Sequence, residues 1–413
     1  MTTLLKATQR PQSVSEYQRA CLSIPSGVNS PVRAFSKLAI SPMVVSSGYG
    51  AIIVDIDGNQ FIDYCLSWGP LICGHAHPQI VEKVQKKVAC GSSFGILTTI
   101  EVEIAEKIRS RIESIEKIRF VSSGTEAAMC AAKLARGFTG RELMVKFSGN
   151  YHGWSSDFVE NTVCLPYNDC DKVYEIFSDL TLRRKIAAVI VEPVGGNMGV
   201  VPSSDQFLHL LREETRKNGS LLIFDEVITG FRLCPGGYQN LIGIDPDLTL
   251  LGKIVGGGFP GAACGGRAEI MDFLAPQGKV YQAGTLSGNP ITMEAGLKTL
   301  ELTETPGFYE RLEMKTKALV DPVAHRLEEK GINACIQRVG SMFTLFLGKR
   351  KVTSFQEAQE LDFEMFKKWY SFLFERGVYF SPSQQEACFI SSAHTADHIE
   401  KTRDLLLEMI DDV

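Results

Sequence analysis

The sequence predicts an α/β fold in which a large domain with a mostly parallel central sheet stands beside a smaller α+β domain. The 413 residues exceed what one compact core usually holds, so two domains are expected. Between residues 61 and 300, short apolar runs alternate with amphipathic helical patterns, which indicates right-handed β-α-β crossovers and a parallel sheet. From residue 301 onward, long helical patterns with strands such as MFTLFL favour a separate α+β unit.

The elements follow in chain order. A short helical start precedes the Gly/Pro-punctuated stretch SIPSGVNSPVRAF, and AIIVDIDGNQFIDY predicts a β-hairpin with Asp57-Gly58 as its turn. The apolar runs expected to form strands of the large sheet are IRFVS, LMVKF, AAVIVEP, SLLIFDE and LTLLGK. We therefore assign residues 61–300 to the large domain and expect residues 1–60 and 301–413 to pack together as the small one.

The composition is ordinary, with 44% hydrophobic and 22% charged residues and a mean hydropathy of +0.01. The net charge of −5 argues against nucleic-acid or membrane partners, because both call for basic patches. The N-terminal segment is too polar for a signal peptide, and no apolar run reaches membrane-spanning length. The eleven scattered cysteines fit buried thiols better than disulfides or a zinc site. We expect a soluble, cytoplasmic protein that acts on a small molecule.

Polar residues follow the predicted strands at the points where those strands end. Asp225 follows SLLIF, Lys253 comes two residues after LTLL, the turn 122–126 follows IRFV, and the segment 148–153 follows LMVKF. Ligands of an open parallel sheet bind beyond the carboxyl ends of its strands. One shared edge would therefore bring these groups together.

Each of these groups also has an ordinary structural explanation. Ser123-x-x-Glu126 is a capping-box pattern, and Asp225 could be a structural acid at a strand end. Lys253 alone could be a surface lysine in a loop, and Tyr151 a core tyrosine. Only their combination favours a functional site.

Together these residues provide what pyridoxal phosphate requires of a protein: a Schiff-base lysine, a carboxylate facing the ring nitrogen and a phosphate cradle. Burial lowers the pKa of a lysine such as Lys253 toward nucleophilic use. A Gly/Ser/Thr turn that opens a helix suits a phosphate. Asp225 would keep the ring nitrogen protonated, and Tyr151 would cover the ring. The sequence therefore predicts an enzyme that moves an amino group on a small molecule.

No metal site is predicted. His75 and His77 alternate along GHAHP, which places them on opposite sides of an extended strand, and no third ligand follows nearby. The run Gly256–Gly258 lacks the context of a Walker loop and gives the chain turning freedom after the lysine.

The chain resembles the glutamate-1-semialdehyde 2,1-aminomutase family, within the class III pyridoxal-phosphate-dependent aminotransferases of fold type I. LLIFDEVITGFR, PDLTLLGKIVGGGFP and AGTLSGNP carry the resemblance to the class, and GVNSPVRAF, SWGP and PSQQEACF that to the aminomutases. The resemblance implies an intramolecular exchange in tetrapyrrole biosynthesis. The pyridoxamine form of the cofactor would aminate glutamate 1-semialdehyde, 4,5-diaminovalerate would stay bound, and the pyridoxal form would take back the other amine to release 5-aminolevulinate.

The resemblance also implies a role for individual residues. Its cofactor-binding residues are Ser123, Gly124, Thr125, Tyr151, Asn197, Asp225, Val227, Lys253 and Thr285. Thr285 would reach the phosphate of a neighbouring subunit, which makes a homodimer the functional unit. Lys253 would also shuttle the proton, with Asp225 and Glu386 as further catalytic groups.

The substrate would be held by residues near the N-terminus. Ser30 and Arg33 would receive its carboxylate, with Trp68 nearby, since an arginine fork suits a carboxylate. Glu386 would lie close to the substrate and the cofactor amine.

One departure from the family concerns the segment after Gly153. The chain continues as WSSDFVENTVCLPYND, so most of the long gate loop of the family is absent. Such lids sequester intermediates, although a partner segment or another loop could cover the site equally well. Otherwise we expect the diamine to escape more readily and the cofactor to be left as pyridoxal more often.

Two other functions remain compatible with the sequence. An ω-amino acid transaminase or an amino-acid racemase on the same scaffold would also keep Lys253 and Asp225, but Ser30, Arg33 and Glu386 favour the mutase. A protein that only binds or sequesters the cofactor is disfavoured, because both Lys253 and Asp225 are present.

Overall fold

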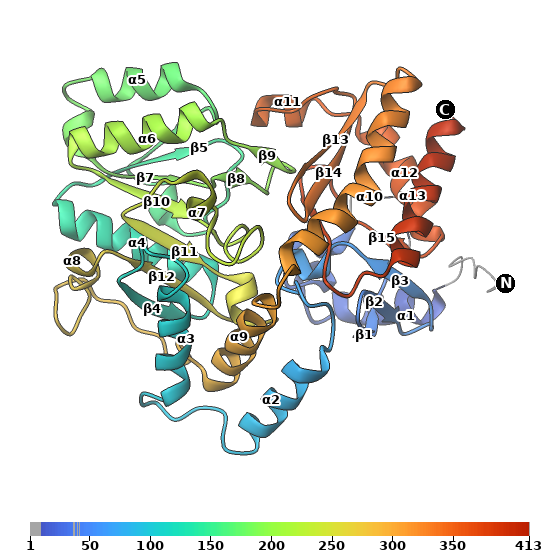
Figure 1. The fold of residues 1–413 in the computed structure, drawn as a ribbon, viewed down its shortest axis with the longest axis horizontal. Helices are drawn as coiled ribbons and strands as arrows, with labels where there is room; N and C mark the ends of the chain where they lie inside the picture. Colours follow the sequence, from blue (N-terminus) through green and yellow to red (C-terminus); the bar gives the residue numbers. More distant parts are fainter. Residues whose placement is uncertain (1–9, 36–37, 39, 41, 413) are drawn as a thin grey trace.

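The computed structural model describes residues 10–35, 38, 40 and 42–412. Residues 1–9 lie outside this range. They belong to the N-terminal segment that is expected to be too polar for a signal peptide. Figure 1 shows two groups of elements side by side: a large sheet with its helices, and smaller sheets with helices from both ends of the chain.

The large sheet has seven strands in the order β4-β12-β11-β10-β7-β5-β6. Its strands are β4 (Lys117–Val121), β5 (Leu143–Phe147), β6 (Thr162–Leu165), β7 (Ile186–Val191), β10 (Leu221–Asp225), β11 (Leu248–Leu251) and β12 (Ala262–Gly266). Strand β12 runs antiparallel to β4 and β11 on either side of it, and the remaining pairs are parallel. All five apolar runs form strands, so the predicted α/β class with a mostly parallel sheet is confirmed. Strand β12 was not predicted, because its sequence AACGG has little β-propensity.

Helices surround this sheet, some packed directly on its strands and others packed on a neighbouring helix. They are α2 (Pro78–Val88), α3 (Thr99–Arg109), α4 (Gly124–Thr139), α5 (Cys170–Ser178), α6 (Asp205–Asn218), α7 (Tyr238–Ile242), α8 (Ala268–Met271) and α9 (Pro290–Thr303). Helix α2, for example, packs on α9. The N-terminus of α4 matters most for the site. Ser123 is its N-cap, and its hydroxyl accepts from the Glu126 amide. Ser123 therefore caps α4 as the sequence pattern suggests, and α4 begins close to the end of β4.

Three smaller sheets complete the fold, and one of them combines both ends of the chain. One contains β1 (Val45–Tyr49), β2 (Ile52–Asp55), β3 (Gln60–Asp63) and β15 (Val378–Tyr379), with β15 parallel to β3. The others contain β13 (Ala334–Val339), β14 (Met342–Leu347) and β16 (Cys388–Phe389), and β8 (Val194–Gly195) with β9 (Val201–Pro202). Strands β2 and β3 pair antiparallel around Gly58, whose φ is 87°, so the predicted hairpin is confirmed.

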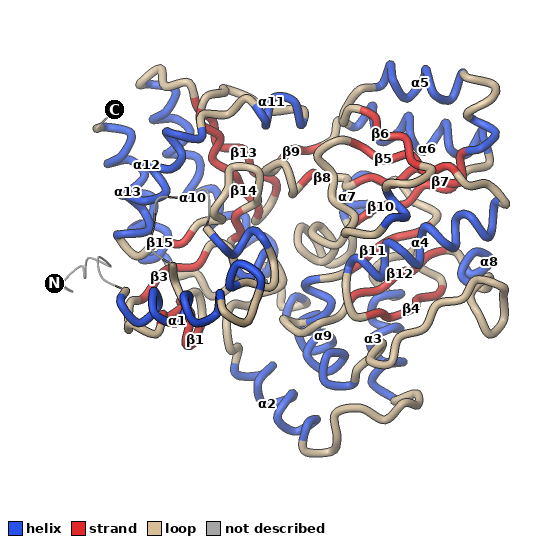
Figure 2. Tube along the Cα trace, turned by 180° about the vertical axis from the view of Figure 1, so that it is seen from behind, coloured by secondary structure: helices blue, strands red, loops and turns tan. Residues whose placement is uncertain are grey.

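The helices beside these sheets come mainly from the C-terminal part. They are α1 (Pro11–Cys21), α10 (Phe308–Glu329), α11 (Phe355–Gln359), α12 (Phe363–Glu375) and α13 (Ala396–Asp411). Figure 2 shows α10, α12 and α13 together beside β13–β15, away from the large sheet.

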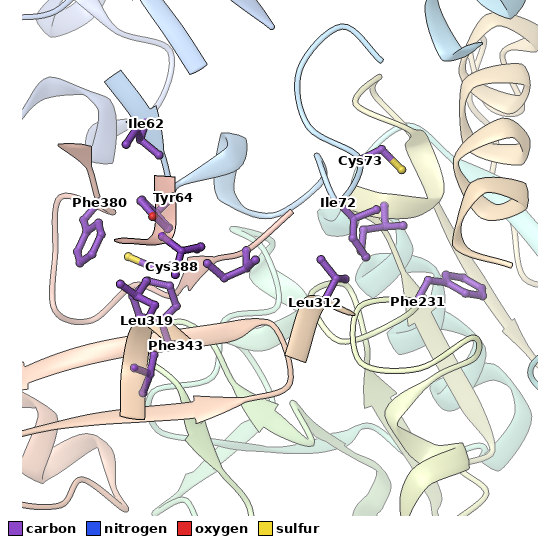
Figure 3. Close-up of a cluster of buried hydrophobic side chains, with 14 of the residues drawn as sticks. Ile62, Tyr64, Ile72, Cys73, Phe231, Leu312, Leu319, Phe343, Phe380 and Cys388 are labelled. Atoms are coloured by element: carbon purple, nitrogen blue, oxygen red, sulfur yellow. The ribbon is translucent and has the colours of Figure 1, made fainter. Parts of the chain in front are cut away.

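One buried cluster spans both groups of elements. Figure 3 shows part of it, in which Tyr64, Phe343 and Phe380 lie on one side and Ile72 and Phe231 on the other. Close packing of this kind leaves little freedom to the segments that cross between the groups. Those segments carry several residues of the site described below.

The eleven cysteines are free, but the expectation that they are buried is wrong for three of them. Cys21 and Cys90 are exposed at the ends of α1 and α2, and Cys164 is exposed on β6, the edge strand of the large sheet. In the part of the chain that the structure describes, no helix is both long and apolar enough to cross a membrane.

Candidate active site

The polar residues at the strand ends line one cavity of about 230 Å³. Lys253 begins a 3₁₀ turn (Lys253–Gly256) after β11, Asp225 ends β10, and Glu192 follows β7. The lining residues are Gly124, Thr125, Tyr151, His152, Gly153, Glu192, Asn197, Asp225, Val227, Ile228 and Lys253. The site thus lies where the parallel strands end.

Lys253 has a backbone φ of 49°, in the left-handed region, which non-glycine residues adopt mainly where the surroundings enforce it. Burial lowers the pKa of its ammonium group, and the nearby carboxylates of Glu192, Glu386 and Asp225 oppose that effect. A lysine in this setting loses its proton more readily than one in water, so its amine is available as a nucleophile or base.

Asp225 is only 6% exposed and is held from two directions. Its Oδ2 lies 2.7 Å from Nδ1 of His152, and its Oδ1 accepts from the Val227 amide at 3.1 Å. A carboxylate acceptor places the proton on Nδ1 of the imidazole. His152 itself is buried, so this pair presents a fixed carboxylate to the cavity.

The start of α4 forms another side of the cavity. Its exposed backbone N–H groups and dipole favour an anion, and Gly124 and Thr125 line the cavity there. A Cβ on Gly153 would come within 2.5 Å of Oγ1 of Thr125, so only glycine allows this approach. Val227 packs 3.4 Å from the position of a Cβ on Gly124. Ser123 caps the helix but is exposed and does not line the cavity.

Glu192 organises the side of the cavity that carries Tyr151 and Asn197. Its Oε1 accepts from the Tyr151 amide at 2.6 Å and from Nδ2 of Asn197 at 2.9 Å. Its Oε2 accepts from the Gly196 amide at 2.8 Å. Burial raises the pKa of Glu192, and the charge of Asp225 adds to the increase.

A second cavity of about 610 Å³ adjoins the first and shares Tyr151, Asn197, Ile228 and Lys253 with it. Its other lining residues are Ser30, Pro31, Val32, Arg33, Trp68, Gly149, Asn150, Gly196, Phe355, Glu386 and Phe389. The four residues that the resemblance assigns to the substrate side therefore lie around one space. Burial raises the pKa of Glu386 to about 7, although Lys253 opposes this shift.

Two predicted residues, Ser123 and Thr285, line neither cavity, and two important ones were missed. Thr285 is exposed in a turn before α9 and lines neither cavity of its own chain. His152 and Glu192 were not predicted. Glu192 directly follows the strand AAVIV, so the strand-end rule that selected Asp225 could have found it; His152 stands beside Tyr151 at another strand end.

The residues present fit pyridoxal phosphate. A buried lysine of lowered pKa, a buried carboxylate held by His152 and a glycine-lined helix N-terminus all line one cavity. These correspond to the aldehyde, the ring nitrogen and the phosphate of that cofactor.

Comparisons with known proteins show the family, the fold and the cofactor class. The model of the family described as "Aminotransferase class-III" matches residues 36–163 and 155–412. The glutamate-1-semialdehyde 2,1-aminomutase of Protochlamydia amoebophila (strain UWE25) is 48% identical, over 98% of this chain and 99% of the relative. That alignment spans 427 positions, more than this chain has residues, so the relative carries residues that are absent here.

Solved structures share the fold. An ω-transaminase from Sphaerobacter thermophilus matches with a TM-score of 0.89 and 32% identity, over 97% of each chain. A glutamate-1-semialdehyde aminomutase from Pseudomonas aeruginosa PAO1, in complex with PMP, matches with a TM-score of 0.87 and 25% identity, over 98% of this chain and 95% of that one. The predictions of fold and of a pyridoxal or pyridoxamine phosphate cofactor are confirmed. The chain belongs to the class III aminotransferase family and, within it, to the glutamate-1-semialdehyde 2,1-aminomutases.

Proposed function

We propose that this enzyme converts glutamate 1-semialdehyde to 5-aminolevulinate by an internal exchange of the amino group, as a step of tetrapyrrole biosynthesis. The observation that carries the proposal is the shared wall of the two cavities. Lys253 lies at their junction, with Asp225 on the cofactor side and Arg33 and Glu386 on the other. Curated relatives at 45–48% identity bear the name of this enzyme.

The residues of the larger cavity bind and orient the substrate. Arg33 offers a guanidinium fork to the substrate carboxylate, and Ser30 adds a hydroxyl beside it. Trp68 and Phe389 supply apolar walls that exclude water from the reacting carbons. A substrate held at its carboxylate keeps both of its reacting carbons near Lys253, so a second amino acceptor is not needed.

The residues of the smaller cavity hold the cofactor and transfer protons. When bound, the cofactor supplies an exchangeable amine or aldehyde and an electron-withdrawing ring. Asp225, fixed by His152, would pair with the ring nitrogen, and Asn197 would lie beside the ring oxygen or the substrate. Val227 would pack under the ring and Tyr151 over it, while Gly124 and Thr125, at the start of the helix that Ser123 caps, would receive the phosphate. Nζ of Lys253 accepts and returns the proton of the reacting carbon, because its lowered pKa suits both steps.

The test is incubation of the enzyme and its cofactor with glutamate 1-semialdehyde alone. We expect 5-aminolevulinate to form with many turnovers and no added amino acceptor. A second candidate, an ω-transaminase, is favoured by the 32% identity with the Sphaerobacter thermophilus enzyme. Product that appears only with an acceptor such as 2-oxoglutarate would support that candidate and contradict the mutase.

Lys253→Ala separates chemistry from binding. We expect turnover to fall by about 10³-fold or more, and the visible absorbance of the lysine-bound cofactor to disappear. Lys315→Ala is the matched control: burial also lowers the pKa of Lys315, but this residue lines neither cavity, so wild-type turnover is expected. Unchanged turnover in Lys253→Ala would contradict the proposed role.

We further propose a cytoplasmic homodimer with residues 61–300 as the cofactor-binding domain and residues 1–60 with 301–413 as the small one. The free thiols suit a reducing compartment. Exposed apolar residues flank Thr285, including Tyr281 (74%) and Leu286 (55%), and such a surface suits a subunit interface. Thr285 would then reach the phosphate of the neighbouring subunit.

A further inference from the structure

Arg232 is a cation buried without a counter-ion. Its side chain is fully buried, Nη2 donates to the Gly69 carbonyl, and Nε and Nη1 have no hydrogen-bond partner. Among the described residues, no carboxylate forms an ion pair with it. Burial lowers the pKa of Arg232 to about 9, so it is charged at neutral pH. An unpaired buried charge opposes folding, which calls for a compensating role.

Two of the groups that Arg232 contacts, Phe389 and Gly69, lie at or directly beside the wall of the substrate cavity. Its guanidinium lies 5.0 Å from the centre of the Phe389 ring, in a cation–π contact, and Phe389 lines the cavity. The Gly69 carbonyl directly follows Trp68, which also lines the cavity. A Cβ on Gly69 would lie 3.1 Å from Cζ of Phe389 and 3.6 Å from Cδ of Lys253, so these three groups pack tightly.

The segment that ends at Gly69 is strained. Leu66, Ser67 and Trp68 have φ values of 47°, 56° and 68°, and Gly69 has 109°. Three successive non-glycine residues in the left-handed region persist only where the surroundings hold them. Asp63 holds the start, because its Oδ1 accepts from the Cys65 and Leu66 amides at 2.8 Å each. The other end is held by Arg232.

We propose that Arg232 is a positioning residue of the active site, which clamps the Gly69 carbonyl and the Phe389 ring and thereby presents Trp68 to the substrate. This role rests on the proposed function. The positive charge of Arg232 also contributes to the lowered pKa of Lys253, although burial of the lysine is the larger cause.

The decisive measurement is hydrogen exchange of the segment 64–70 in the enzyme as purified, without substrate. The amides of Leu66, Trp68 and Gly69 are hydrogen-bonded in the clamped segment. In Arg232→Met, which removes the charge and the donors, we expect these amides to exchange roughly 10- to 100-fold faster, the factor expected when one charged hydrogen bond is lost. Amides of the large sheet are expected to keep their wild-type protection.

Arg10→Met is the matched control. Arg10 is also buried, stacks 4.4 Å from the centre of the Phe374 ring and has unpartnered Nε and Nη1 atoms, but it lines neither cavity. We expect Arg10→Met to leave exchange in the segment 64–70 unchanged. Equal acceleration in both variants would mean general loosening of the core and would overturn the proposal.

If Arg232→Met does not fold, Arg232→Lys and Arg232→Gln test whether Arg232 holds the segment 64–70. Lysine keeps a cationic donor and glutamine only a neutral one, so exchange in Arg232→Lys should lie closer to wild type. Identical exchange in the two variants, or wild-type exchange in Arg232→Met, would overturn the clamp.

Kinetics supply a second readout. We expect KM for glutamate 1-semialdehyde to rise by roughly tenfold or more in Arg232→Met, with a smaller change in kcat, because a misplaced Trp68 weakens binding. A fall in kcat alone would contradict the positioning role. Absence of aminomutase turnover in the wild-type enzyme would overturn the proposed function instead, and the exchange experiment would still test the clamp.

Discussion

At the scale of single residues, Lys253 shares a water-poor region with three carboxylates, those of Glu192, Glu386 and Asp225. Burial acts in opposite directions on the two kinds of group. It lowers the pKa of the lysine and raises the pKa of both glutamates, so the uncharged form of each group is populated more than it would be in water. Proton movement between such groups near neutral pH requires little free energy.

Glu386 gives a pH-dependent prediction. Its pKa is about 7 in the folded protein against a usual value of 4.5, so the folded state keeps a proton that the unfolded state releases. The stabilisation is therefore complete below pH 4.5 and is lost as the pH rises to 7. Glu386→Gln removes this loss. We expect the stability of the variant relative to wild type to increase between these two pH values, by about 3 kcal/mol at most.

Urea unfolding at several pH values between 5 and 8 measures this difference. Glu310→Gln, at an exposed position, is the control for removing a carboxylate from the surface. A difference between Glu386→Gln and wild type that does not vary with pH would show that Glu386 does not have the raised pKa.

At the scale of elements, the short connection between β5 and β6 is held against α4. Phe158 is buried, and Asp157 lies 2.7 Å from Nη1 of Arg136. Trp154 and Val159 are 85% and 75% exposed. The connection is thus short and is anchored to α4 at Asp157 and Phe158.

We therefore predict that 4,5-diaminovalerate escapes from this enzyme several times more often per turnover than from a relative with the full loop. The cofactor should correspondingly be left as pyridoxal more often. Trapping of the released diamine, together with the cofactor spectrum after turnover, measures both effects. Equal release by the two enzymes would show that another segment closes the site.

The elements that could be predicted are those whose signal is local. Runs such as AAVIV and SLLIF are apolar over a whole strand, and the strand-end rule then located Asp225 and Lys253. Strand β12 escaped prediction because AACGG forms a strand only between two neighbours that supply its hydrogen bonds. The left-handed segment Leu66–Trp68 also escaped, because contacts from Asp63 and Arg232 enforce it. The resemblance, rather than residue patterns, indicated Ser30, Arg33, Trp68 and Glu386.

At the scale of the whole molecule, the position of Thr285 gives a test of subunit arrangement. Lys253→Ala and Thr285→Val should each be weakly active alone. If Thr285 serves the neighbouring subunit, a mixed dimer contains one site with both wild-type residues. Mixing equal amounts after subunit exchange should then restore roughly a quarter of wild-type turnover, since half of the dimers are mixed and each has one intact site of two.

Sedimentation at about twice the chain mass of 45.5 kDa should accompany this recovery. No recovery on mixing, with subunit exchange confirmed, would mean that Thr285 acts within its own chain or has no role in cofactor binding.

The pairing of β15 with β3 also has a consequence for synthesis on the ribosome. Val378 and Tyr379 pair with Ile62 and Asp63, so the first strands are complete only after most of the chain has been made. At typical rates of translation, roughly 15–60 s separate the emergence of the two strands. Throughout that time β3 has an open edge, and Ile53 and Phe61, which are buried in the finished protein, have no C-terminal partners. We therefore expect that a stop codon before β15 would leave the N-terminal strands β1–β3 without their sheet partner, so that the beginning of the protein would fail to fold as well as its end.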